Sequence, residues 1–381
     1  MEVASYGEGM KRNLCGKFAH RFFFFYDPWA CFARFFFPDK KKSIPKSPKI
    51  LLCCWASLGD VLLATSVIPL IRRRWPLATI GFLCAPTSFS VIEGSKEIDH
   101  IHQVSSWMIL GQGKIRNLYS LVYHFFAIYP KAIREIKKVG YDISIELHPF
   151  FPNCIPLMRR AGISRRIAFT SGGYDAWITD SVDFSDLGKY LPNFYPLLLE
   201  KIGIEIGEES QKSPPSLLKS RCKAVLHMGT SDPRKAWESS YWGSLGRALK
   251  ERGYEIILTG KGKQDRALIA ESGLESLGVN FCDALDFQGL SKVIQEAALI
   301  ISIDSLPVHL AALYGVPFVG LYLYNANVEL WLPDAPNCYL LVHNACMRRC
   351  KEKAHPRAIY LEEICPSDVL CYALKLLGEI A

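Results

Sequence analysis

Short apolar runs alternate with amphipathic stretches along most of the chain. In the first half, the apolar runs that predict strands lie at 50–56, 79–85, 142–147 and 165–169. Runs without polar interruption are typical of parallel strands that are buried on both faces. The stretch 59–74 has a helical pattern, as does the Tyr-, Phe- and Lys-rich segment within 103–140. This alternation predicts βαβ units and a mostly parallel sheet.

The alternation starts again after "GEESQKSPPSLLKS" at 207–220, whose charges and Pro-Pro pair are typical of an interdomain linker. Four strands are expected at 223–229, 254–260, 299–304 and 316–323, with helices at 240–253, 263–272, 290–298 and 305–315. The predicted organisation is an N-terminal extension at 1–48, Rossmann-like domains at 49–212 and 216–365, and a closing helix at 366–381. Two such domains are expected to form a cleft at the carboxyl ends of their strands, where open α/β sheets bind ligands.

The N-terminal extension contains the aromatic run "RFFFFYDPWACFARFFFP" at 21–38. Asp27, Pro28 and Arg34 interrupt this run, so it predicts neither a cleavable signal peptide nor a membrane span, which needs about 20 mainly apolar residues. Two interpretations stay open. The segment lies on an anionic membrane surface with the nearby "KKK" at 40–42 close to the headgroups, or its aromatic residues pack onto the body of the protein. The basic residues at both ends favour the membrane surface.

Composition limits the class of protein. The chain has 381 residues, half of them apolar, which is enough for a large core and indicates two domains, because single cores stop growing at about 250–300 residues. Residues 1–49 hold ten Lys/Arg and four Asp/Glu, so they carry most of the net charge of +8. The near-neutral remainder argues against a surface that follows nucleic acid. Most of the 13 cysteines lie in apolar runs, which favours a reducing cytosol.

Asp60 starts the helical stretch that follows the first predicted strand, in "SLGDVLLA" at 57–64. A carboxylate in a first helical turn commonly satisfies backbone N–H groups, so capping is one explanation of Asp60. Its place at the carboxyl end of a strand favours a second explanation, which is catalysis. Ser57 belongs to the same turn, and Gly59 fits either a tight turn or a close approach of the backbone to a ligand.

Two more stretches in the second half carry candidate chemistry. "HMGTSDPRKAW" at 227–237 groups the hydroxyls of Thr230 and Ser231 with the cations of Arg234 and Lys235, which together suit a diphosphate. The alternative is a basic surface loop. "ISIDSLPVHLAALYGVP" at 301–317 ends a buried strand at Asp304 and then opens a helix, whose first N–H groups favour anions. The alternatives there are an N-cap formed by Asp304 and Ser305, and a core histidine at 309.

Together these stretches resemble glycosyltransferase family 9, the lipopolysaccharide heptosyltransferases, which have two Rossmann domains in the GT-B arrangement with a cleft between them. The family signature "SLGDxxxxTP" is matched by Ser57-Leu58-Gly59-Asp60 with Thr65-Ser66. The family loop "GxxxxxKxWP" is matched by Gly229 through Lys235-Ala236-Trp237. The family signature "DSGxxHLAAAxGxP" is matched by "DSLPVHLAALYGVP" at 304–317. The resemblance covers about residues 48–377.

The resemblance implies an inverting transfer of a heptose from an ADP-sugar to a hydroxyl of the lipid A–Kdo inner core. Asp60 matches the catalytic base, and Lys235 would stabilise charge on the departing diphosphate. The residues that match donor-site positions, or lie beside them, are Thr230, Ser231, Asp304, Ser305, Leu306 and His309, with Gln264 or Asp265 near the ribose. The resemblance implies no cofactor and no essential metal. The enzyme is expected at the cytoplasmic face of the inner membrane. The N-terminal extension favours peripheral binding there, and the near-neutral remainder of the chain argues against nucleic acid as a partner.

The sequence departs from the family pattern at three places. Leu306 stands where family members usually have Gly, which could alter the sugar accepted or mark a weakened enzyme. Glu238 follows Trp237 in place of Pro. The tail at 346–365 contains Cys346 and Cys350, but with His343 and His355 their spacing is irregular for zinc, so no metal is expected.

Alternatives to this reaction stay open. Leu306 gives weight to a transferase of the same fold that uses another nucleotide sugar and builds another surface glycan. A non-catalytic, membrane-docked relative is disfavoured, because a scaffold has no need of Asp60, Lys235 and Asp304 together. A dehydrogenase is disfavoured too, since no G-x-G-x-x-G follows the first strand.

Overall fold

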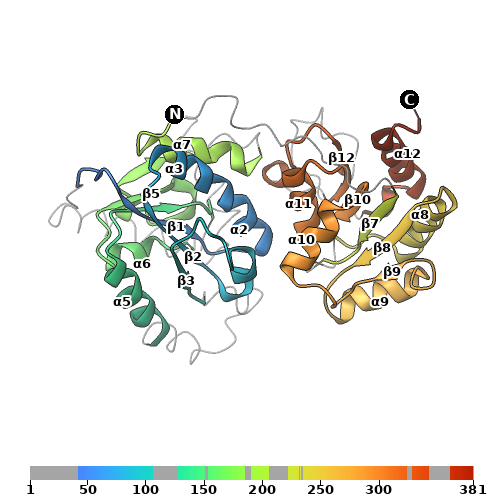
Figure 1. The fold of residues 1–381 in the computed structure, drawn as a ribbon, viewed down its shortest axis with the longest axis horizontal. Coiled ribbons are helices and arrows are strands. Elements are labelled where there is room, and N and C mark those ends of the chain that lie inside the picture. Colours follow the sequence, from blue (N-terminus) through green and yellow to red (C-terminus); the bar gives the residue numbers. More distant parts are fainter. Residues whose placement is uncertain are drawn as a thin grey trace. The chain divides into compact units, whose positions relative to one another are not determined.

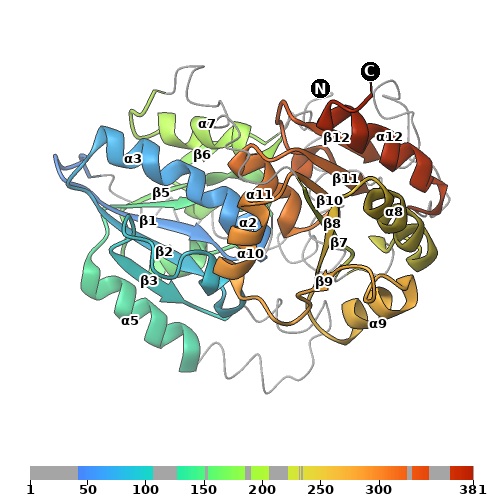
Figure 2. The ribbon, with the colours of Figure 1, turned by 45° about the vertical axis from the view of Figure 1, so that its right-hand side comes forward.

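The computed structural model describes residues 42–105, 127–150, 153–184, 190–205, 222–230, 232, 235–323, 328–342 and 361–380. The chain divides into two compact units, Met1–Ser210 and Gln211–Ala381. In the described part of each unit, the strands form a parallel sheet with helices on both faces (Figures 1 and 2). The predicted domain boundaries at 212 and 216 fall in a stretch outside the described residues and stay predictions.

The sheet of the first unit has the strand order β3-β2-β1-β4-β5-β6, which is the order of a doubly wound Rossmann sheet. Its strands are β1 Lys49–Cys54, β2 Thr79–Cys84, β3 His100–Gln103, β4 Ile143–Glu146, β5 Arg165–Phe169 and β6 Asp180–Val182. Cys53 of β1 is paired with Glu146 of β4, so these two central strands end side by side. Both strands are buried almost throughout, as uninterrupted apolar runs predict.

Two layers of helices cover this sheet. They are α2 Leu58–Ala64, α3 Ile68–Arg74, α5 Tyr129–Val139, α6 Ile155–Arg160 and α7 Tyr195–Glu200. Helices α5 and α6 lie on one face, and α2, α3 and α7 lie on the other (Figure 1). The face below α5 and α6 contributes Leu51 and Cys53 to a core cluster that includes Ile136 and Met158. This packing fixes the ends of β1 and β4.

The sheet of the second unit has the order β12-β11-β10-β7-β8-β9, which repeats the first arrangement. Its strands are β7 Lys223–His227, β8 Glu255–Thr259, β9 Val279–Asn280, β10 Leu299–Ile303, β11 Phe318–Tyr322 and β12 Cys338–Val342. Its helices are α8 Ser239–Glu251, α9 Lys263–Ser272, α10 Phe287–Gln295, α11 Leu306–Tyr314 and α12 Pro366–Leu377. Helices α8, α9 and α12 share a core cluster with β7, β8 and β10, built around Trp237 and Trp242.

The predicted elements agree with the observed ones at the centre of each sheet and differ at the edges. Strand 165–169 and helix 263–272 have the predicted bounds. The short edge strands β3, β6, β9 and β12 were not predicted, so the expected count of four strands in the second unit is wrong. The predicted helix 59–74 is interrupted by a 3₁₀ turn at Thr65–Val67. Pro69 follows in the first turn of α3, where it has no N–H to continue the α-helical hydrogen bonds of α2.

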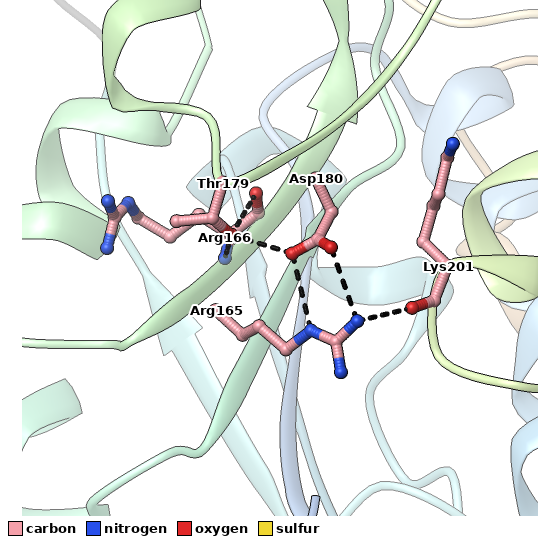
Figure 3. Close-up of polar contacts among 5 residues, drawn as sticks. All are labelled: Arg165, Arg166, Thr179, Asp180 and Lys201. Carbon is pink, nitrogen blue, oxygen red and sulfur yellow. Dashed lines mark hydrogen bonds and ion pairs between the residues drawn. The ribbon is translucent and has the colours of Figure 1, made fainter. Parts of the chain in front are cut away.

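Edge strand β6 is held by polar contacts at its amino end (Figure 3). The Arg165 guanidinium donates to both carboxylate oxygens of Asp180, at 3.3 and 3.2 Å, and to the carbonyl of Lys201 at 2.6 Å. The hydroxyl of Thr179 accepts from the Arg166 N–H at 2.8 Å and lies 2.8 Å from Asp180 Oδ2. Because β6 has only three residues, its backbone pairing with β5 is short. The side-chain contacts supplement this pairing and help to hold the strand in the sheet.

Candidate active site

The predicted site residues fall into two groups, one in each unit. In the first unit, Asp60 is the third residue of α2 and is half-buried. Its Oδ2 accepts the backbone N–H of Ser57 at 2.9 Å, which is half of a capping box. Gly59 is a residue of α2, so the explanation by a tight turn is wrong, and a close approach to a ligand stays a prediction. The capping role of Asp60 is therefore present, and it holds the carboxylate at the carboxyl end of β1.

Two residues that the sequence analysis did not single out lie near Asp60. Half-buried His148 follows β4, and its Nδ1 lies 3.2 Å from the carbonyl of Phe150. Burial lowers the pKa of His148, whereas the charge of Asp60 raises it. Tyr195 begins α7, and its buried hydroxyl has no hydrogen-bond partner among the described residues. Burial raises the pKa of Tyr195, and the charges of Cys54 and Asp60 raise it further. The sequence signal that could have identified His148 is its position as a polar residue directly after the predicted strand 142–147.

Glu146 is a third group that was missed, because it lies inside a predicted strand. Its side chain is buried, and its Oε2 accepts the N–H of Cys154 at 2.6 Å. Burial raises the pKa of Glu146 to about 8, against the lowering effect of its hydrogen bonds. A carboxyl group with this pKa is mostly protonated at neutral pH. It therefore adds little charge beside Asp60.

In the second unit, Lys235 and Asp304 form an ion pair, with Nζ 2.5 Å from Oδ2. The two side chains are 27% and 10% exposed, respectively. Asp304 directly follows β10, and its N–H donates to the carbonyl of Leu321 at the end of β11. The fold thus joins two residues that the sequence separates by 69 positions. A cation held in this way can balance negative charge at the carboxyl end of the sheet.

The start of α11 lies beside this ion pair. Ser305 is the N-cap residue and its backbone is extended, but its buried Oγ makes no capping bond and has no partner among the described residues. Ser305 therefore occupies the N-cap position, as the alternative of an N-cap expects, but its side chain does not cap the helix. Leu306 is the first residue of α11 and is half-buried. Its backbone is not in the left-handed region, so a Leu is accommodated at this position without backbone strain. Gly315 ends the helix with φ at 66°, a conformation that favours glycine.

His309 lies on α11 and is largely buried, at 6% exposed. Burial lowers the pKa of His309 to about 4, although the charge of Asp304 raises it. The charge of Lys235 lowers it further. His309 is therefore neutral at pH 7. It can offer a hydrogen bond to a ligand, but it brings no positive charge.

The remaining predicted donor residues are less closely grouped. The hydroxyl of Thr230 accepts the N–H of Asp232 at 3.1 Å, whereas Ser231 and Arg234 lie outside the described residues. Gln264 is exposed on α9. Asp265 is buried instead, and its Oδ2 accepts the N–H of Lys261 at 2.8 Å.

Gly229, in the loop after β7, packs closely against the side chain of Asp265. A Cβ atom at Gly229 would lie 1.9 Å from Asp265 Oδ2, so a side chain does not fit there. The close packing of Asp265 against Gly229 and its hydrogen bond from Lys261 indicate a structural role for Asp265. Exposed Gln264 is the better candidate of the two for a ligand contact.

Comparison with known proteins connects this geometry to a family. The profile of glycosyltransferase family 9 (heptosyltransferase) matches residues 195–356, a stretch that contains Lys235, Asp304 and His309. The chain carries a family 9 glycosyltransferase domain. The match begins after Asp60, so the family profile itself covers only the last helix of the first unit and most of the second.

Relatives of family 9 extend the similarity over most of the chain. Lipopolysaccharide heptosyltransferase 3 of Escherichia coli is 24% identical over 341 residues, which are 84% of this chain and 96% of the relative. The family 9 structure from Veillonella parvula has a TM-score of 0.68 at 18% identity and covers 87% of this chain and 98% of its own. E. coli heptosyltransferase WaaC with ADP has a TM-score of 0.66 at 12% identity and covers 86% and 99%, respectively. The predicted GT-B class of fold, with two Rossmann-like domains, is confirmed.

The described residues also bear on three expectations, which concern membrane-spanning helices, the state of the cysteines and metal-binding side chains. No helix among them is long and apolar enough to cross a membrane. The nine cysteines among them are free, and Cys53, Cys54 and Cys84 are buried. No group of three or more metal-ligating side chains occurs among them, and the tail with Cys346 and Cys350 lies outside them.

Proposed function

We propose that this glycosyltransferase moves a heptose from an ADP-sugar to a hydroxyl of the lipopolysaccharide inner core, with inversion at the anomeric carbon. The observation that carries the proposal is the Lys235–Asp304 ion pair beside the unpartnered Ser305 hydroxyl at the start of α11. It occurs within the stretch that matches the heptosyltransferase family. The names of the relatives, which are lipopolysaccharide heptosyltransferases, support the choice of sugar and acceptor.

The first unit supplies the base in this proposal. The acceptor oxygen forms a bond to the anomeric carbon while the bond from that carbon to the diphosphate oxygen breaks, and ADP leaves with the electron pair. The acceptor proton passes to the carboxylate of Asp60. A positioned base contributes about 10²- to 10⁴-fold to the rate. The capping contact with Ser57 fixes one carboxylate oxygen, which supports a defined position for the base.

The second unit holds the donor in this proposal. The ammonium of Lys235, the N–H groups at the start of α11 and the Ser305 hydroxyl balance the charge that develops on the departing diphosphate. Thr230 and Ser231 contribute further hydroxyls, neutral His309 contributes a hydrogen bond, and Gln264 contacts the ribose. These groups are cations, dipoles and hydroxyls. We therefore expect full turnover in the presence of a metal chelator.

A second candidate is a family 9 transferase that uses a different nucleotide sugar. Half-buried Leu306 favours it, because its side chain occupies the first position of α11, next to Ser305. A side chain at that point can reduce the space for the sugar. Leu306→Gly should then improve the use of ADP-heptose relative to the wild type.

A binding screen with purified protein separates the two candidates. ADP-heptose is compared with UDP-, GDP- and CMP-sugars by calorimetry. The proposal predicts that ADP-heptose binds at least ten times more tightly than the others. Preference for another base or sugar would overturn the choice of donor, and binding of none of them would overturn the proposed function.

A further inference from the structure

The carboxyl ends of β1 and β4 bring a second polar side chain to the proposed base. Cys53 pairs with Glu146, and the N–H of Leu147 donates to the carbonyl of Cys53 at 2.8 Å. The residue after Leu147 is His148, and α2, which has Asp60 in its first turn, follows β1. Two adjacent parallel strands therefore deliver Asp60 and His148 to the same edge of the sheet. The charge of Asp60 acts on the imidazole, since it raises the pKa of His148.

Buried Glu146 holds the backbone that carries His148. Its Oε1 accepts the N–H of His148 at 3.4 Å, and its Oε2 accepts the N–H of Cys154 at 2.6 Å. One carboxyl group thus ties both ends of the connection between β4 and α6 to the end of the strand. Ser171 adds a further anchor, because its hydroxyl donates to the carbonyl of Pro149. The backbone position of His148 is therefore set by contacts within the first unit.

The orientation of the His148 ring follows from its contacts. A carbonyl oxygen can only accept a hydrogen bond, so the Nδ1 atom that lies 3.2 Å from the Phe150 carbonyl carries the proton. The Phe150 ring meets the imidazole edge-on, with centroids 5.4 Å apart at 86°. In the neutral ring, Nε2 then carries a lone pair and acts as a hydrogen-bond acceptor. Burial lowers the pKa of His148, which keeps this neutral form at pH 7.

We propose that Nε2 of His148 accepts a hydrogen bond from a second hydroxyl of the acceptor sugar, next to the hydroxyl that Asp60 deprotonates. A carboxylate and an imidazole acceptor at the same edge of the sheet suit two neighbouring hydroxyls of a sugar. His148 thereby selects which hydroxyl of the acceptor reaches the base. This inference rests on the proposed role of Asp60 and adds an acceptor-binding residue in the first unit.

Two substitutions at position 148 test the role of Nε2. His148→Asn keeps a donor near the position of Nδ1, within reach of the Phe150 carbonyl, and lacks Nε2. His148→Gln restores an acceptor near the position of Nε2. We expect His148→Asn to raise the KM for the acceptor about 3- to 10-fold with the donor KM unchanged, as loss of one neutral hydrogen bond predicts. His148→Gln should stay within about twofold of the wild type. His100→Gln, at an exposed histidine of β3, is the matched control.

The product reports the selection of the hydroxyl. His148→Asn should give a mixture of linkages, seen by NMR of the product, whereas the wild type and His148→Gln give one linkage. Unchanged acceptor KM and a single linkage in His148→Asn would overturn the inference. Equal losses in His148→Asn and His148→Gln would overturn it as well, because the acceptor atom would then not matter.

A measurement without turnover separates this inference from the proposed function. Nitrogen-15 NMR of the wild type should show His148 with the proton on Nδ1, and Asp60→Asn should lower its pKa. A proton on Nε2, or a pKa unaffected by Asp60→Asn, would contradict the pairing of the two residues. If the NMR result is as expected and the wild type fails to transfer heptose, the proposed reaction is wrong while the pairing stands.

Discussion

At the residue scale, the Lys235–Asp304 ion pair is the contact on which the proposed donor side of the site rests. The pair is partly buried, so each charge depends on the other more than an exposed pair would. Lys235 can serve a diphosphate only if its charge is shared between Asp304 and the ligand. The two residues should therefore act as a unit in binding.

Substitutions of the pair test this. Lys235→Met should weaken the binding of ADP about tenfold, because a cation near the diphosphate is lost. In the double variant with Asp304→Asn, the two effects should not add, since the residues contact each other. Isothermal calorimetry measures both. Lys250→Met, at an exposed lysine of α8, is the control and should bind ADP like the wild type. Wild-type affinity in Lys235→Met would remove Lys235 from the site.

Buried Glu146 makes the stability of the protein depend on pH. Its pKa is raised from 4.5 to about 8, so the folded state keeps a proton that the unfolded chain has lost in this range. The stability from the protonated carboxyl is fully present below the unfolded pKa and is lost as the pH rises through the folded pKa. The slope from this group is at most about 1.4 kcal/mol per pH unit.

Urea unfolding at pH 5 and pH 8 measures this slope. Between these values the free energy of unfolding of the wild type should fall more steeply than that of Glu146→Gln, whose side chain cannot ionise. Glu93→Gln, at an exposed position, should keep the wild-type slope. If Glu146→Gln has the wild-type slope as well, the buried carboxyl is not the cause.

At the element scale, the short edge strand β6 depends on side chains for its place in the sheet. Asp180 accepts two hydrogen bonds from the guanidinium of Arg165 (Figure 3). Asp180→Ala leaves that guanidinium without its carboxylate and should lower the free energy of unfolding by about 1–3 kcal/mol. Thermal or urea unfolding measures the loss. Asp183→Ala, at an exposed carboxylate just after β6, should change it by less than about 0.5 kcal/mol. Equal effects of the two variants would contradict the role of the Arg165 contact.

The sequence predicts the central elements well, because a strand buried on both faces leaves an uninterrupted apolar run, as in β1 and β10. The edge strands leave no such run: both residues of β9 are exposed, and β6 has three residues. Asp60, Lys235, Asp304 and His309 were found through motifs. Glu146 and His148 were not, since their relation to Asp60 arises from the pairing of β1 with β4, and strand order is not visible in a local pattern.

At the scale of the whole molecule, the basic and aromatic N-terminal extension is the part that we propose to lie on a membrane surface. Pro48 belongs to the body of the first unit, since its carbonyl accepts the N–H of Thr79 at 3.1 Å. A deletion of residues 1–41 therefore removes the aromatic run and keeps this contact.

Sedimentation with vesicles tests the extension. The full chain should bind vesicles that contain anionic lipid and should bind neutral vesicles weakly, because basic residues contribute about 1 kcal/mol each near an anionic surface. The shortened chain should lose most of this binding and keep its affinity for ADP. Equal binding of both chains to anionic vesicles would assign membrane contact to another part of the protein.

The central claim is that the protein transfers a sugar with inversion and uses Asp60 as the base. The most direct measurement follows ADP release and the anomeric configuration of the product by NMR, in the wild type and in Asp60→Asn. The Asn side chain keeps an oxygen for the N–H of Ser57, so the helix start is preserved while the base is lost. We expect a product of opposite anomeric configuration from the wild type, and turnover about 10²- to 10⁴-fold lower in Asp60→Asn, with ADP affinity within about twofold of the wild type. A product of retained configuration, or wild-type turnover in Asp60→Asn, would contradict the account.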